Sequence, residues 1–121
     1  MNAWKTIKNG KLPALSQPVL VEGLPGIGNV GKVAVDFLVD ELGAKKIATF
    51  SSDSLPNSVF VNEKNLIEMP VIEMYHKKAK KQDVLFLVGD VQPIDERSCY
   101  MFCKEVIDVF NGFGGKSIIT L

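Results

Sequence analysis

The residues that could do chemistry gather in one glycine-rich stretch, at positions 23–32. Gly26, Gly28 and Gly31 match the pattern G-x-G-x-x-G of dinucleotide-binding loops, and positions 26–32 also match most of a phosphate-binding P-loop. In such loops the backbone N–H groups at the start of a helix bind phosphate, and a lysine neutralises its charge. One possible chemistry is therefore nucleotide or phosphate binding through Gly28, Gly31 and Lys32.

Each of these motifs lacks a residue that its chemistry needs. A P-loop has Ser or Thr after the lysine to hold Mg²⁺, whereas this chain has Val33. A dinucleotide site has an acidic residue about 20 positions further on. Asp53 is the candidate, but we expect it in a loop beyond a strand end. Asp90 follows an apolar run, as a magnesium-supporting acid would, and we favour a structural role in which it accepts backbone N–H groups.

The other reactive side chains do not make up a catalytic or metal-binding set. The chain has one histidine, His76, and one arginine, Arg97, so both a hydrolytic triad and bidentate phosphate recognition have few residues to draw on. Cys99 and Cys103 offer two ligands where a structural zinc site wants four. We assign both to the buried face of a helix. We therefore expect no catalytic residues, no metal and no cofactor.

The composition is typical of one soluble globular domain. The chain has 121 residues, of which 46% are hydrophobic and 23% charged, and its formal net charge is zero. Zero net charge gives no general attraction to nucleic acid or to an anionic membrane. Two cysteines without a visible secretory signal are typical of a reducing compartment. We expect a cytoplasmic protein with no nucleic-acid or membrane partner.

An apolar strand and a helix must position the glycine-rich stretch. We expect the strand at 18–22 and the helix at 29–42, with Asn29 as N-cap and Gly43 as left-handed C-cap. The helix has one apolar stripe, which we expect to face the core. The stripe consists of Val30, Val33, Ala34, Phe37, Leu38 and Leu42.

The rest of the chain predicts further strands around a second helix. Residues 1–17 read as an edge segment and linker, and strands are expected at 46–50, 58–62, 66–75, 83–88 and 116–121. A short turn makes 58–62 and 66–75 a β-hairpin insert. The helix is expected at 95–111, with Asp95 as N-cap. The prediction is one three-layer-like α/β domain over 1–121, with a mixed, mostly parallel sheet.

Three motifs in order along the chain resemble the PAC2 family, which is related to proteasome assembly chaperones. They are Glu22-Gly-Leu-Pro-Gly-Ile-Gly-Asn-Val-Gly31, Ser54-Leu-Pro56 and Leu87-Val-Gly-Asp-Val-Gln-Pro93. The resemblance implies a fold like that of purine nucleoside phosphorylases without their catalytic residues. It also implies self-association and binding to proteasome α subunits. Family members are longer, so the chain looks like an N-terminal portion, and the C-terminal tail by which some relatives dock lies outside it.

The favoured hypothesis is therefore a non-enzymatic assembly factor, with a nucleotide or phosphate binder as the alternative. In the favoured hypothesis the glycines permit close strand–helix contact and the apolar residues between them contact a partner. The interface candidates in the glycine-rich stretch are Gly23, Leu24, Pro25, Gly26, Ile27, Gly28, Asn29 and Gly31. The candidates in two strand-end loops are Asp53, Leu55, Pro56, Asp90, Gln92 and Pro93.

Overall fold

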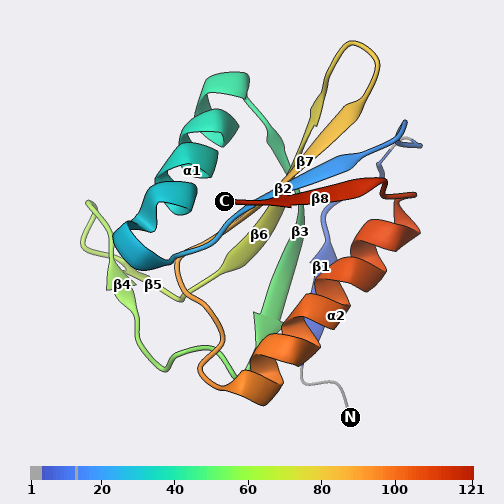
Figure 1. The fold of residues 1–121 in the computed structure, drawn as a ribbon. Coiled ribbons are helices and arrows are strands. Elements are labelled where there is room, and N and C mark those ends of the chain that lie inside the picture. The colour runs from blue at the N-terminus through green and yellow to red at the C-terminus, as the bar shows by residue number, and fades with distance from the viewer. Residues whose placement is uncertain (1–3, 13) are drawn as a thin grey trace.

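The computed structural model describes residues 4–12 and 14–121, so residues 1–3 and 13 of the expected edge segment lie outside it. One helix covers each face of a six-stranded sheet, which makes three layers (Figure 1). The elements are β1 (Trp4–Lys8), β2 (Val19–Gly23), the 3-10 turn η1 (Ile27–Asn29), α1 (Val30–Leu42), β3 (Lys45–Ser52), β4 (Phe60–Val61), β5 (Ile67–Glu68), β6 (Ile72–Lys78), β7 (Asp83–Gly89), α2 (Glu96–Gly112) and β8 (Ser117–Thr120).

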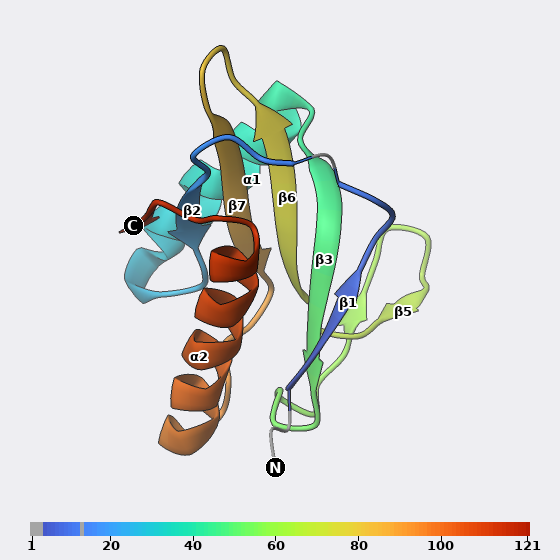
Figure 2. The same ribbon diagram turned by 90° about the vertical axis from the view of Figure 1, so that its right-hand side faces the viewer.

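The sheet is mixed, as expected, but it is not mostly parallel. Its strand order is β1-β3-β6-β7-β2-β8. Only β7–β2 and β2–β8 pair in parallel, whereas β1–β3, β3–β6 and β6–β7 are antiparallel. The reason is local, because a tight hairpin joins β6 to β7 and the first strand adds to the edge in the reverse direction. Figure 2 shows β1 and β3 on the side of the sheet away from β2.

The core has one half on each face of the sheet. On one face Val35 and Val39 of α1 pack with Phe86 and Val88. On the other face α2 packs over a larger cluster. That cluster includes Trp4, Leu20, Phe50, Met74, Leu85, Leu87, Phe102, Val106 and Phe110. Alternate residues of β7 therefore face opposite layers, and this explains its continuous apolar sequence.

The expected strand at 66–75 is two separate strands. β5 pairs only with β4, in a small sheet of its own, while β6 begins at Ile72 in the main sheet. Pro70 lies between them and has no N–H to donate to a ladder, so the break falls where proline would interrupt pairing. The β4–β5 hairpin is thus an insert, as expected, but a short one.

The bounds of α1 agree with the expectation, whereas its orientation does not. Gly43 ends the helix with φ 61°, in the left-handed C-cap conformation. Val35 and Val39 face the sheet, while Val30, Val33 and Phe37 of the expected core stripe are exposed. Apolar side chains occupy most of the circumference of α1, so periodicity alone could not identify the side that meets the sheet.

The second helix forms as expected, although its cysteines are not core residues. Asp95 caps α2 by accepting from the backbone N of Ser98. The buried residues of α2 are Ser98, Phe102, Val106 and Phe110, whereas Cys99 is half-buried and Cys103 is exposed. Among the described residues, neither helix is long and apolar enough to cross a membrane.

Candidate interaction site at the glycine-rich loop

Two glycines allow β2 and α1 to approach closely. A Cβ added at Gly23 would lie 2.4 Å from the carbonyl oxygen of Gly31 and 2.5 Å from Cγ2 of Val35. A Cβ added at Gly31 would lie 2.8 Å from the carbonyl oxygen of Leu121, just past the end of β8. The close packing inferred from the sequence is therefore present at these two positions, where any side chain would collide with backbone.

A Cβ on either of the other two glycines of the loop would meet no atom closer than 3.8 Å. No atom lies within 4 Å of a Cβ built on Gly26. Position 28 favours glycine for a different reason, because its φ is 68°, in the left-handed region. Asn29 occupies the N-cap position with φ 52°, but its side chain does not cap α1. Its Oδ1 accepts instead from the backbone N of Gly26, at 3.2 Å, and this bond holds the turn together.

The apolar side chains of the loop have different environments. Leu24 is buried in the core cluster under α2, so it is not available to a partner, contrary to the expectation. Ile27 is fully exposed at the tip of the loop. Pro25 is half-buried, and its carbonyl oxygen accepts from the side-chain amide of Gln92. Of the loop's apolar residues, Ile27 is thus the one held out toward solvent.

The structure brings the three candidate loops to the same end of the sheet. β2 and β7 are parallel, and β3 runs in the direction of β7 because both are antiparallel to β6. Gln92 joins the loop after β7 to the glycine-rich loop. The backbone N of Ile94 donates to the carbonyl oxygen of Ser54, at 3.3 Å, which joins it to the loop after β3.

The remaining strand-end candidates have mainly structural surroundings. Asp53 is exposed in the turn after β3, as expected, whereas Leu55 is half-buried against the core. Pro56 and Pro93 are also half-buried. Asp90 accepts from the backbone N of Val71 at 3.3 Å, which is the structural role that the sequence favoured.

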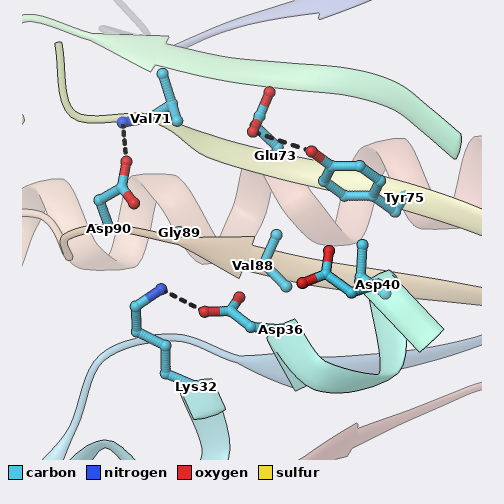
Figure 3. Close-up of a pocket in the computed structure, with 10 residues that line it drawn as sticks. Lys32, Asp36, Asp40, Val71, Glu73, Tyr75, Val88, Gly89 and Asp90 are labelled. Carbon is cyan, nitrogen blue, oxygen red and sulfur yellow. Dashed lines mark hydrogen bonds and ion pairs between the residues drawn. The ribbon is translucent and has the colours of Figure 1, made fainter. Parts of the chain in front are cut away.

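A pocket of about 240 Å³ lies beside these loops, between α1 and the ends of β6 and β7 (Figure 3). Lys32, Asp36 and Asp40 reach it from α1, and Glu73 and Tyr75 from β6. Val39, Val71, Val88, Gly89 and Asp90 complete its lining. Its position at the carboxyl end of a strand, beside a helix, is where ligands of open α/β sheets bind.

The charges of this pocket do not suit a phosphate group. Four carboxylates line it against one ammonium, and that ammonium, on Lys32, is 2.7 Å from Oδ2 of Asp36. The phenol of Tyr75 donates to Glu73 at 3.3 Å, and burial followed by the Glu73 charge raises the pKa of Tyr75. Lys46 also pairs with Glu73 at 2.8 Å, but the carboxylates still outnumber the ammonium groups, so an anion in this pocket would meet like charge. Of the alternative phosphate site, only Lys32 lines the pocket, so the pocket does not support that site.

The cysteines and acidic residues form no metal centre in the part of the chain that is described. No three His, Cys, Asp or Glu side chains of that part are placed to hold a metal ion. Cys103 is exposed by surface area, but partial desolvation of its sulfur and the neighbouring Cys99 raise the pKa of the thiol, which keeps it in its less reactive protonated form.

Sequence reasoning missed most of the exposed apolar surface. The β4–β5 hairpin region and the loop after β7 expose large apolar side chains, which are Val59, Phe60, Val61, Leu66, Ile67, Met69 and Ile94. The sequence assigned the residues between 59 and 69 to the predicted β-hairpin insert, without indicating that their side chains would be exposed. Pro70 could have indicated this exposure, because a proline at that position separates the hairpin from the main sheet. A two-stranded hairpin outside the sheet has no core against which to bury its apolar side chains.

Comparison with known proteins gives a consistent picture. A sequence model of the PAC2 family matches residues 20–121. An uncharacterized protein of Methanocaldococcus jannaschii is 29% identical over 116 residues, which cover 96% of this chain and 45% of that protein. The crystal structure of Pyrococcus furiosus PbaB, described as an archaeal proteasome activator, is 30% identical with a TM-score of 0.89, over 99% of this chain and 51% of that one.

Two more distant structures share the fold. Pyrococcus furiosus PbaA, described as an archaeal homolog of proteasome-assembly chaperone, has a TM-score of 0.69 at 21% identity, over 97% of this chain and 47% of that one. A proteasome-assembly chaperone homologue from Mycobacterium tuberculosis has a TM-score of 0.69 at 17% identity, over 84% and 48%. The chain spans about half the length of the relatives it matches.

Proposed function

The chain belongs to the PAC2 family, and on that premise we propose that it is a non-enzymatic, chaperone-like protein that associates with proteasome subunits. The descriptions of PbaB and PbaA as proteasome activator and assembly-chaperone homolog support a proteasome-related partner. We further propose that the partner is a proteasome α subunit, that the protein acts in the cytoplasm, and that it also associates with itself.

The observation that carries this proposal is the exposed apolar surface at the carboxyl end of the sheet. Ile27 and Ile94 are exposed on loops that Gln92 and Ser54 tie together through hydrogen bonds. Apolar side chains on braced loops lose little conformational freedom when a partner covers them, so they are suited to anchor a protein interface. The acidic pocket beside them offers no comparable support for a nucleotide.

Co-migration with a cognate α subunit tests the proposal. Ile27→Asp should weaken the complex at least tenfold, because a carboxylate at a buried contact must lose its hydration. Ile7→Asp is the matched control, since Ile7 is also exposed but lies on β1, at the far edge of the sheet from β2. Size-exclusion chromatography and surface plasmon resonance would measure both variants.

Two results would contradict the proposal. One is the absence of any complex between the unaltered chain and α subunits at concentrations of about 100 μM, which corresponds to roughly 5.5 kcal/mol of binding free energy. The other is equal weakening by Ile27→Asp and Ile7→Asp, which would place the contact elsewhere.

A further inference from the structure

The first helix has an apolar face that nothing in the described chain covers. Val30 is 75% exposed, Val33 64% and Phe37 61%, and Ala34 between them is exposed as well. Their spacing of i, i+3, i+4 and i+7 puts them on one side of α1. The opposite side, with Val35 and Val39, packs on the sheet (Figure 1). The exposed residues therefore form a second apolar face, directed away from the core.

The outer face of α1 has no charged residue until Glu41, near the carboxyl end of the helix. Lys32, Asp36 and Asp40 turn toward the pocket beside β6 and β7 (Figure 3). Glu41 follows Phe37 by four residues, so it continues the line of the outer face at the carboxyl end of the helix. The face thus runs from apolar residues near the start of α1 to one acid near its end.

The ends of α1 carry the wrong charges for its own dipole. The first turn has no acidic residue and the last turn has no basic one, whereas Asp40 and Glu41 are in the last turn. Negative charge is unfavourable at the carboxyl end of a helix and favourable at the amino end. A second helix running in the opposite direction would place its amino end beside these acids and remove the mismatch.

We propose that the outer face of α1 binds a second copy of this chain, with the two α1 helices antiparallel about a two-fold axis at Ala34. This inference deepens the self-association in the proposed function and rests on it. In that register Val33 and Phe37 of each copy pack against the other helix, and the small side chain of Ala34 permits close approach. Glu41 of one copy then lies beside the Ile27–Asn29 turn that begins α1 in the other.

Charge is the reason to choose a second copy as the occupant. Between Val30 and Phe37 the outer face itself has no charge, so two copies meet without like-charge repulsion. At both ends an acid meets a helix amino terminus, and the symmetry makes this contact twice. The outer edge of β8 is the competing surface, because it is uncharged and exposes Ile118 and Ile119.

Sedimentation equilibrium on the full 121-residue chain tests the arrangement. We expect a reversible dimer of the 13.3 kDa chain, with a dissociation constant between about 1 and 100 μM, since one helix face is a small interface. Phe37→Lys should raise that constant at least 100-fold, because the lysine would be buried twice per dimer. Ile7→Lys, at a residue that is 59% exposed on β1, should leave it unchanged.

Glu41→Lys separates association from folding. It should raise the dissociation constant about tenfold, because two acid–dipole contacts are lost, and the effect should shrink as salt is added. The same substitution places a cation at the carboxyl end of α1, so it should leave thermal stability unchanged or higher. A weaker dimer with a more stable monomer would show that the contact, and not the fold, has been lost.

Cross-linking checks the register. In a Cys99→Ser/Cys103→Ser background, Ala34→Cys should cross-link into dimers with a short bis-maleimide, whereas Ala79→Cys in the β6–β7 turn should not. A chain that stays monomeric at about 0.5 mM would overturn the proposal. So would a dimer that survives Phe37→Lys and dissociates with Ile119→Lys, which would assign self-association to β8. Ile27 adjoins Glu41 of the other copy in this register, so binding to α subunits is measured separately with Ile94→Asp, on the loop after β7, and either proposal can fail alone.

Discussion

Glycine has two separate physical roles in the loop between β2 and α1. At Gly23 and Gly31 the absence of a side chain lets one backbone approach another. At Gly28 it permits a positive φ, and Gly26 lies in open space. The G-x-G-x-x-G pattern alone could not separate these roles, because it contains no information about what lies opposite each residue.

A series of alanine substitutions should separate the roles. Gly23→Ala should lower the free energy of unfolding by about 3 kcal/mol, because its Cβ would meet the carbonyl oxygen of Gly31. Gly28→Ala should cost about 1 kcal/mol, since φ is 68°. Gly26→Ala, at φ −152°, should change it by less than about 0.5 kcal/mol. Urea denaturation would measure all three, and equal costs at Gly23 and Gly26 would contradict the packing explanation.

At the scale of elements, the sequence predicts where helices lie better than which way they face. The caps Gly43 and Asp95 set the ends of α1 and α2 as expected, because capping is local chemistry. The prediction of which face of α1 is buried was wrong, because apolar residues lie on both sides of the helix and only tertiary contacts decide which side meets the sheet. The surfaces proposed to meet partners are the exposed face at Phe37 and the loop residues Ile27 and Ile94, and the apolar pattern of the sequence does not distinguish such surfaces from core.

The β6–β7 hairpin is held by a buried carboxylate that sequence reasoning did not single out. β6 continues to Lys78, three residues beyond the predicted strand end at 75. Asp83 is 1% exposed, and it accepts from the backbone N of Ser16 at 2.6 Å and lies 2.7 Å from Nε2 of His76. The Nζ atom of Lys78 is 3.3 Å away. Asp83 therefore ties the segment before β2 to the start of β7.

This contact predicts a dependence of stability on pH. Burial by itself raises the pKa of Asp83, but the hydrogen bonds from His76, Ser16 and Lys78 outweigh it and lower the pKa. A carboxyl whose folded pKa lies below its unfolded pKa of about 3.9 stabilises the fold above that pH, and the stabilisation is lost as pH falls through the folded pKa.

Asp83→Asn should therefore cost about 3 kcal/mol near pH 7, because His76 and Lys78 lose their carboxylate. The difference from the unaltered chain should begin to shrink below about pH 4 and should be lost as pH falls through the lowered folded pKa, where the native carboxyl also becomes protonated. Urea denaturation at several pH values would measure it, with the exposed Asp53→Asn as control. If the difference in the free energy of unfolding stayed constant down to about pH 2, the cost of Asp83→Asn would come from the shape of the side chain and not from its charge.

At the scale of the whole molecule, contacts between distant parts of the chain decide the topology. The sequence predicts an α/β domain with a mixed sheet, because alternating strand and helix patterns leave few alternatives. The sequence could not predict the order of the strands. β3 pairs with β6, which places β1 and β3 on the far side of the sheet from β2, and no local pattern specifies β6 as the neighbour of β3. Trp4 is the clearest case, since it begins the first strand and packs against α2 near the other end of the chain.

Trp4 should therefore control the stability of the whole fold. Its ring lies 4.8 Å from that of Phe102, and its Nε1 donates to the carbonyl oxygen of Ser98 at 3.2 Å. Trp4→Ala should lower the free energy of unfolding by about 3–5 kcal/mol, because it leaves a cavity between β1 and α2. Trp4→Phe keeps a ring against Phe102 and loses the hydrogen bond, so it should cost about 1–2 kcal/mol. Circular dichroism during urea denaturation would measure both. A small shift of the urea midpoint by Trp4→Ala would contradict this prediction. It would show that β1 is a loosely attached edge and that the larger core cluster packs without the first strand.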